Sequence, residues 1–136
     1  MCACHQLRRA TRGMTEIYET GMAPSDIKAT QLPILVALGS GGDLPVTTLA
    51  GMLALDRTTL TRNLKVLEDR RLVRTAEYED DARVRMVSLT LEGSTVLTGA
   101  LAQWREVQQV VEAQFGRDRL RALHGELAAL AQAVGG

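Results

Sequence analysis

Residues 55–74, LDRTTLTRNLKVLEDRRLVR, constrain the fold more than any other stretch of the chain. We expect one helix from Asp56 to about Arg70, because the Asp56 carboxylate can accept from the free backbone N–H groups of a first helical turn. Apolar residues then recur at helical spacing on one face, which predicts that this face is buried. The residues of that face are Leu60, Leu64 and Leu67.

The opposite face of the same helix is polar and cationic. At about 3.6 residues per turn, Thr58, Arg62 and Lys65 project away from the leucines. On an isolated helix such a face is most often solvated surface. Arginine can also bind guanine bidentately, and threonine can contact phosphate or the thymine methyl, whereas lysine favours phosphate. The candidate DNA-recognition face therefore consists of Thr58, Thr59, Thr61, Arg62 and Lys65.

The flanks of this helix favour the DNA-binding reading. A short helix is expected over Pro45–Ala54, only a few residues earlier, as in a helix-turn-helix. The following segment, Leu72–Tyr78, is rich enough in strand-forming residues to be extended. A polar turn, Glu79–Arg83, separates it from a second strand, Val84–Leu89. Two helices followed by a two-stranded ribbon predict a winged helix.

These motifs, taken together, resemble the signature of the multiple-antibiotic-resistance regulator (MarR) family. Their spacing matches that family without gaps over Leu49–Gly93, and helices of suitable length flank the match. The resemblance implies a dimeric winged-helix DNA-binding protein, usually a repressor that a small ligand or an oxidant releases. The residues that carry the resemblance are Asp56–Arg62, Leu67-Glu68, Leu72-Val73 with Arg74, Asp81-Ala82-Arg83 and Leu89-Thr90 with Gly93.

The expected fold class is mainly α with a small β-ribbon, a winged helix-turn-helix between N- and C-terminal dimerisation helices. We expect a single domain in which residues 1–29 and 91–136 form the dimerisation helices and residues 30–90 form the DNA-binding lobe. Thr30 and Thr90 are predicted helix caps. The further predicted helices cover Met1–Gly21, Gln31–Leu38, Leu91–Phe115 and Arg117–Val134.

The terminal helices carry apolar stripes that a small domain can hardly cover, so a monomer would leave an exposed apolar patch. Such stripes are more often packed within their own chain, but here we expect them to pack against the same helices of a second chain. A symmetric homodimer would place two recognition helices on two half-sites. The expected partner is therefore double-stranded DNA with a pseudo-palindromic operator.

Charge is segregated along the chain. The formal net charge is zero, which argues against a non-specific polyanion binder. From Arg57 to Arg74, however, six cations face two acids, a local charge of +4 that suits a site-directed DNA reader. The cations are Arg57, Arg62, Lys65, Arg70, Arg71 and Arg74, and the acids are Glu68 and Asp69.

Three residues near the expected ribbon turn are further candidates for DNA binding: Asp81, Arg83 and Arg85. An arginine in an acidic turn is commonly a surface ion pair that contributes little. The alternative is that Asp81 orients Arg83 into a narrow minor groove, as the family resemblance implies for the matching Asp-x-Arg. Arg85 is a candidate for a phosphate contact.

Cys2, Cys4 and His5 form one chemical cluster. They supply at most three crowded ligands, so we expect no metal site. The hydroperoxide-sensing branch of the family has a reactive cysteine early in its first helix, and Cys4 falls at that place. Tyr18 matches one tyrosine of that branch, whereas Arg8 and Ala29 stand where others would be. Thiol-based redox sensing through Cys2 and Cys4 is thus an alternative to packing of Cys4 as a small hydrophobe.

A small-molecule effector is the expected signal, bound between the terminal helices and the DNA-binding lobe. Each residue of the candidate effector pocket would also fit an ordinary core. The candidates are Cys4, Arg8, Met14, Tyr18 and Trp104.

The sequence contains no recognisable catalytic set, so neither an enzyme nor a cofactor is expected. No apolar run is long enough to span a membrane, and the first residues lack the apolar core of a signal peptide. We therefore expect a cytoplasmic protein. The rival function is a winged helix that binds another protein and has no operator.

Overall fold

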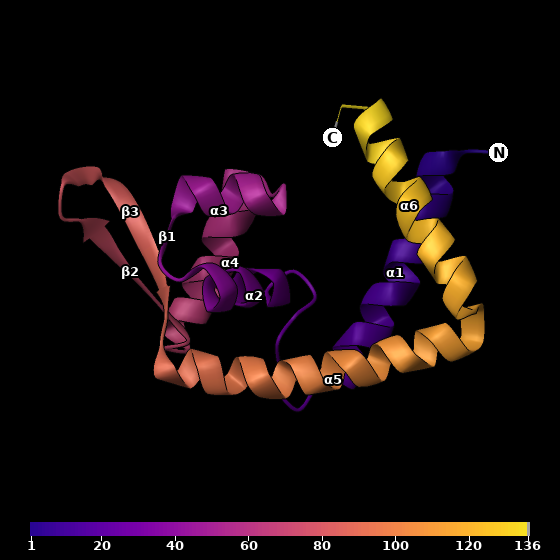
Figure 1. The fold of residues 1–136 in the computed structure, drawn as a ribbon, viewed down its shortest axis with the longest axis horizontal. Helices are drawn as coiled ribbons and strands as arrows, with labels where there is room; N and C mark the ends of the chain where they lie inside the picture. Colours follow the sequence, from indigo (N-terminus) through magenta and orange to yellow (C-terminus); the bar gives the residue numbers. More distant parts are fainter. Residues whose placement is uncertain (136) are drawn as a thin grey trace.

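The computed structural model describes residues 1–135 and contains six helices and three strands in that range (Figure 1). None of these helices is long and apolar enough to cross a membrane. In chain order the elements are α1 Ala3–Gly21, α2 Leu32–Gly41, β1 Leu44–Pro45, α3 Val46–Leu53, α4 Arg57–Asp69, β2 Val73–Tyr78, β3 Asp81–Leu89, α5 Leu91–Phe115 and α6 Arg117–Ala133.

The elements are arranged in two parts joined by the long helix α5 (Figure 1). Helices α2, α3 and α4 and the strands form one lobe, from which the β2–β3 hairpin projects as a wing. Helix α5 runs along the base of this lobe to a second part, where α1 and α6 stand beside each other. The predicted fold class, a winged helix-turn-helix flanked by terminal helices, is confirmed.

The sheet differs from the prediction in two details. It has three antiparallel strands in the order β1-β3-β2, because Leu44 and Pro45 pair with Val87 and Met86. The wing turn is also tighter than expected, since β3 begins at Asp81 and the turn is confined to two residues. The β2–β3 register shifts between Glu77 and Tyr78, which lets the hairpin close there.

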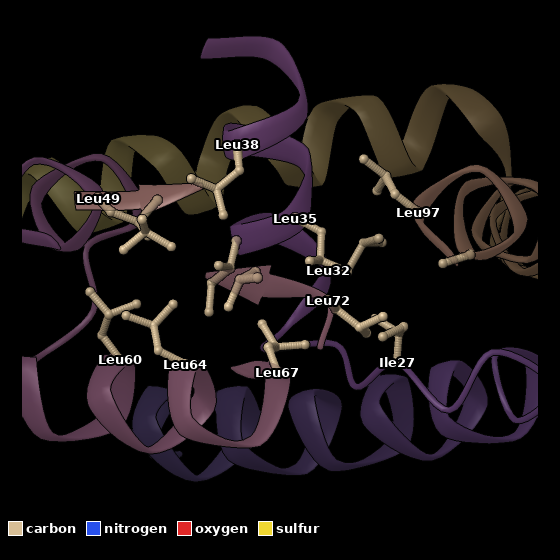
Figure 2. Packing of buried hydrophobic residues seen from close by; sticks show 14 of the residues in the cluster. Ile27, Leu32, Leu35, Leu38, Leu49, Leu60, Leu64, Leu67, Leu72 and Leu97 are labelled. Carbon is tan, nitrogen blue, oxygen red and sulfur yellow. The ribbon is translucent and has the colours of Figure 1, made fainter. Parts of the chain in front are cut away.

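The core of the lobe formed by α2, α3, α4 and the strands is aliphatic, and α4 faces it directly (Figure 2). Leu60 and Leu67 have no exposed surface, and Leu64 is almost as buried. They pack in one cluster with residues of α2 and α3, including Leu35 and Leu49. Burial of this stripe confirms the predicted inner face and fixes which side of α4 is left to solvent.

The helix ends follow the expected local chemistry except at α2. Thr90 caps α5 by accepting from the Gly93 N–H at 2.9 Å, as predicted. Thr30 does not cap α2, because the helix starts after Gln31. The Gln31 side chain accepts from the Lys28 N–H at 3.0 Å and so ties the preceding turn instead.

The terminal helices leave much of their apolar surface uncovered. A second, smaller cluster lies where α1, α5 and α6 meet, formed by Val107, Val111 and Leu120 with partly buried neighbours. Beyond it, residues 3–13 of α1 and residues 121–133 of α6 are all exposed. A face defined here as the terminal seam is exposed by 36–40 % at each of its residues: Leu7, Ile17, Leu123, Leu127 and Leu130.

Candidate nucleic-acid interface

The start of α4 is fixed by Asp56. Its carboxylate accepts from the Thr59 backbone N–H at 2.7 Å and from the Thr59 hydroxyl at 2.9 Å. The backbone hydrogen bond from Thr59, followed by the hydroxyl bond, holds the pKa of Asp56 below its ordinary value. The predicted cap is confirmed, and it sets the direction in which the first turn of α4 points.

Four of the five predicted recognition residues are exposed on α4: Thr58, Thr61, Arg62 and Lys65. Lys65 lies 3.8 Å from Asp69, but both side chains are largely solvated, so this pair is easily separated. Thr59 is different because it is half-buried and its hydroxyl donates a hydrogen bond to Asp56. The structure thus separates Thr59, a capping residue, from the other four.

Asp81 and Arg83 form an oriented pair on the first residues of β3. Arg83 donates from Nε to Asp81 Oδ1 at 3.1 Å and from Nη2 to Oδ2 at 3.2 Å. The Arg83 backbone N–H also donates to Asp81 Oδ1 at 3.0 Å. These bonds, the side-chain ones first, lower the pKa of Asp81. The Arg83 side chain remains 91 % exposed, so its guanidinium is held in one direction without being buried.

Arg85 belongs to a hydrogen-bonded chain that joins the wing to α4. Its Nη2 donates to the Thr75 hydroxyl at 3.0 Å, and that hydroxyl donates to Glu68 Oε1 at 2.8 Å. Arg85 is therefore positioned by a strand neighbour and, through it, by the last turn of α4. Neither Thr75 nor Glu68 was among the predicted site residues, although both are polar and lie next to predicted ones.

A groove of about 420 Å³ separates α4 from the wing and collects basic residues from both elements, although Arg62 and Thr58 are not among its lining residues. Its cationic side chains outnumber the single carboxylate, Glu68, by four to one. Arg57 and Thr47 were missed as lining residues, because periodicity along α4 says nothing about what the wing and α3 place beside it. The basic residues of the groove are Arg57, Lys65, Arg83 and Arg85.

Arg70 has another role than the local charge count implied. Its guanidinium donates to the carbonyl oxygens of Ser25 and Asp26, at 3.0 and 2.7 Å, in the loop between α1 and α2. Arg70 therefore joins the end of α4 to this loop. The cationic face of α4 has fewer residues than the charge count along the sequence suggested. Arg71 and Arg74 are exposed.

The five candidate effector residues do not meet in one pocket. Cys4 and Arg8 line an apolar groove of about 580 Å³ between the first turns of α1 and the end of α6. Met14 and Tyr18 instead pack near the α1–α5–α6 junction. Cys4 and Tyr18 are thus about 21 Å apart along one helix, at about 1.5 Å per residue.

Tyr18 lies at the joint between α1 and α5. It packs against both apolar clusters, and Trp104 lies beside it. Partial burial raises the pKa of Tyr18, and the indole N–H of Trp104 counteracts part of that effect. The contact between α1 and α5 is thus apolar except for the polar groups of Tyr18 and Trp104. Cys2 and Cys4, by contrast, are free thiols exposed at the far end of α1.

Comparison with known proteins assigns the family. A model of the MarR family matches residues 25–84. The chain is 35% identical to the M. tuberculosis transcriptional regulator MosR, whose crystal structure was determined in complex with DNA. The two structures superimpose with a TM-score of 0.84, and the alignment covers 98% of each chain. It is 28% identical over 120 residues to the uncharacterized HTH-type transcriptional regulator YhbI of Bacillus subtilis (strain 168), covering 86% of this chain and 78% of YhbI.

A further solved structure is the transcriptional repressor CouR bound to a 23-mer DNA duplex, with 25% identity and a TM-score of 0.88. The alignment covers 96% of this chain and 92% of CouR. The match in sequence extends from the lobe to the terminal helices, and the order of elements agrees with a winged helix-turn-helix. The chain therefore belongs to the MarR family of winged-helix DNA-binding transcription regulators.

Proposed function

We propose that the chain is a homodimeric repressor that binds a pseudo-palindromic operator in double-stranded DNA and that a small-molecule ligand releases it. The observation that carries the DNA-binding part is the groove between α4 and the wing, which gathers four cationic side chains on a chain of zero net charge. The complexes of MosR and CouR with DNA support the same use of this lobe.

Within each half-site, α4 supplies the base contacts. Arg62 binds a guanine edge in the major groove, because its side chain is exposed opposite the buried leucines. Thr58 and Thr61 contact thymine methyl groups or phosphates, and Lys65 contacts phosphate. Thr59 acts through the cap, since its hydroxyl is bonded to Asp56.

The wing supplies the contacts outside the major groove. Arg83 enters an adjacent minor groove in the direction that Asp81 sets, where a narrow, A·T-rich groove attracts a cation. Arg85, fixed by Thr75, meets a backbone phosphate between the two elements. Basic residues from α4 and the wing thus act on one stretch of duplex.

The terminal seam is the proposed dimer contact. Its five residues keep more than a third of their surface exposed on a single chain, and they come from the two ends of the sequence. Packing them against a second copy removes that apolar area from water, which is the main favourable term in association. Residues 1–29 and 91–136 then form the dimerisation part and residues 30–90 the DNA-binding lobe.

Release by a ligand follows from the same arrangement. Two lobes bind both half-sites only at one separation, which the terminal helices set. A compound that binds one separation better than the other shifts the population between them. A planar, apolar or weakly acidic compound fits the groove between α1 and α6, which Leu7 and Leu130 line with apolar surface and Arg8 and Arg12 with positive charge.

Selection of duplexes from a random-sequence library, followed by footprinting and sedimentation equilibrium, tests the proposal. We expect an inverted repeat with half-sites about one DNA turn apart and a particle of twice the 14.8 kDa chain mass. If no duplex binds more tightly than bulk DNA at physiological salt, the lobe is a protein-interaction module. Such a regulator acts in the cytoplasm, where it meets the chromosome.

A further inference from the structure

The loop between α1 and α2 is held by the end of the recognition helix. Arg70, the residue that closes α4, donates from Nη1 to the Asp26 carbonyl at 2.7 Å and from Nη2 to the Ser25 carbonyl at 3.0 Å. A guanidinium bound to two successive carbonyls is fixed in both direction and distance. The contact joins residues that are more than forty positions apart in the sequence.

The same loop is held from the opposite side by α5. The Ser25 N–H donates to the Gln103 side-chain oxygen at 3.3 Å, and the Ser25 hydroxyl donates to the Met22 carbonyl at 3.0 Å. Met22 itself is buried in the core, with 1% of its surface exposed. Ser25 therefore joins α4 to α5 through its own backbone. We call this chain of contacts, Arg70–Ser25–Gln103, the interhelix link.

The backbone of the loop turns sharply at Asp26, whose own N–H donates to the Met22 and Ala23 carbonyls at 3.0 and 3.1 Å. Asp26 has φ 52, a left-handed value that a residue with a side chain rarely adopts. The Arg70 bond to the Asp26 carbonyl stabilises the peptide directly after this strained position. Removing Arg70 is thus expected to free the loop as well as the end of α4.

The link matters because of where the lobe is otherwise attached to α5. Helix α4 has its main contacts with α3 and β2, inside the lobe. The chain enters α5 at Thr90, which also bonds to the Leu72 carbonyl at 3.0 Å. Gln103 lies about 20 Å further along α5, at about 1.5 Å per residue. Helix α2 also packs against α5, with Leu97 and Ala100 in the core cluster of the lobe, and the link adds to this apolar packing a polar contact that reaches the end of α4.

We propose that Arg70 is a positioning residue for DNA binding, which holds α4 at a fixed angle to α5 through Ser25 and Gln103. Both of its Nη groups are used by carbonyl oxygens, so it acts on DNA through the direction of α4 and touches no base. The inference rests on the proposed dimer, because the angle of each α4 to its α5 sets the separation of the two recognition helices.

The test measures spacing tolerance, which a loss of stability or of a phosphate contact would not change. Affinity is compared for the duplex selected by the wild-type protein and for the same duplex with one base pair inserted between its half-sites. The insertion moves the half-sites apart by about 3.4 Å. Arg70→Met and Gln103→Leu break the link at opposite ends. Gln103→Glu keeps an oxygen acceptor for Ser25, and Arg74→Met removes a charge from an exposed position on β2.

We expect the ratio of the affinity for the selected duplex to that for the lengthened duplex to fall by about tenfold in Arg70→Met, which loses hydrogen bonds from a charged group, and by about threefold to tenfold in Gln103→Leu, which loses a neutral hydrogen bond. Gln103→Glu and Arg74→Met should keep the wild-type ratio. If the broken-link variants weaken both duplexes equally, the inference is wrong. If Arg70→Met does not fold, the comparison of Gln103→Leu with Gln103→Glu tests the inference instead. A wild-type protein with no preference for spacing would instead reject the two-half-site mode itself.

Discussion

At the scale of single residues, the arginines of the DNA-binding lobe differ in what holds them. Arg62 is exposed and has no hydrogen bond to any other residue between 1 and 135. Arg83 is oriented by a carboxylate while its side chain stays 91 % exposed. Arg70 is bound to two carbonyl oxygens. These differences predict different effects of removing each guanidinium.

Replacement of Arg62 by alanine should weaken operator binding by about 1–3 kcal/mol and relax the preference at one base pair in each half-site. The reason is that the proposed contact is bidentate to a base, which no neighbouring side chain replaces. Binding to a panel of single-base operator variants measures both effects. Arg105→Ala, at an exposed position of α5, is the charge-matched control. An Arg62→Ala protein that is folded, dimeric and fully selective would show that the face is wrongly assigned.

Replacement of Arg83 by alanine should lower affinity and reduce the salt dependence of binding by about one unit of slope. Arg83→Lys keeps the charge but loses the two-point contact with Asp81, so it should restore the slope without restoring the affinity. Titrations at several salt concentrations separate these results. Unchanged slope and affinity in Arg83→Ala would mean that the Asp81 pair only stabilises the hairpin.

The Asp56 cap makes the stability of α4 depend on pH. Its pKa is lowered in the folded chain, so its contribution is complete above the ordinary aspartate value of about 3.9 and is lost as the pH falls through the lower folded value. Asp56→Ala should therefore lower the unfolding temperature at pH 7 and change it less at pH 3. Asp56→Asn keeps an acceptor oxygen, so its unfolding temperature at pH 7 should lie between those of the wild type and of Asp56→Ala. An equal loss at both pH values would exclude the charged cap as the cause.

Residue roles that depend on near neighbours were the predictable ones. Asp56 caps α4 through Thr59, three positions away, and Thr90 caps α5 through Gly93. Arg70 was counted among the cations that suit a DNA reader, because its carbonyl partners lie more than forty positions away in the sequence. A local sequence pattern contains no information about such a contact.

At the scale of elements, one tight contact lies between the start of α5 and the end of the α4–β2 turn. A Cβ on Gly93 would overlap the Leu72 carbonyl and crowd the Leu89 side chain, whereas a Cβ on Gly99 meets nothing within 4 Å. The start of α5 and the α4–β2 turn therefore approach each other this closely only because residue 93 has no side chain.

Gly93→Ala should destabilise the fold by about 1–3 kcal/mol, since the backbone must move to admit the methyl group. Gly99→Ala on the same helix should stabilise it by about 0.5–1 kcal/mol, because alanine restricts the unfolded chain and favours the helix. Denaturant unfolding of the two variants gives both values. If the Gly93→Ala protein were as stable as Gly99→Ala, the contact between α5 and the α4–β2 turn would be looser in solution than in the structure.

The helices and the β2–β3 hairpin could be predicted because periodicity and caps are local. Strand β1 could not, since Leu44 and Pro45 become a strand only by pairing with Val87 and Met86 far along the chain. The wing turn was drawn too long for a related reason. Asp81 and Arg83 look like turn residues in sequence, yet the register brings Asp81 opposite Tyr78 in the ladder.

At the scale of the whole molecule, the candidate signal sites lie at two places on α1. The thiols and the groove beside Leu7 are at its free end, and the Tyr18–Trp104 contact is at its joint with α5. The sequence placed the thiols, Leu7 and Tyr18 on one predicted helix and Trp104 on another, but it did not show how deep in the molecule each of them lies. Ligand control and redox control therefore use different parts of the same helix and can be separated by substitution.

Cys4→Ser distinguishes the two signals. The Cys4 side chain lines the apolar groove between α1 and α6, so oxidation to a sulfenate, or a disulfide with Cys2 or another chain, would place a polar or cross-linked group there. Under redox control the variant binds operator but is no longer released by an organic hydroperoxide. Under ligand control it binds and is released by the ligand as the wild type is, because serine keeps the size of the side chain.

We expect ligand control, since the groove has mainly apolar walls and a cationic rim that suit a weak acid whatever the state of the thiol. Release from a labelled operator, followed by fluorescence anisotropy with hydroperoxide or with compounds found by thermal shift, measures both responses on one sample. Cys2→Ser separates the two oxidised forms, because Cys2 precedes the helix and is not part of the groove: this variant can still form a sulfenate at Cys4 but not a disulfide between Cys4 and Cys2. Hydroperoxide release that is present in the wild type and in Cys2→Ser but absent in Cys4→Ser would establish Cys4 as the sensor and overturn this expectation.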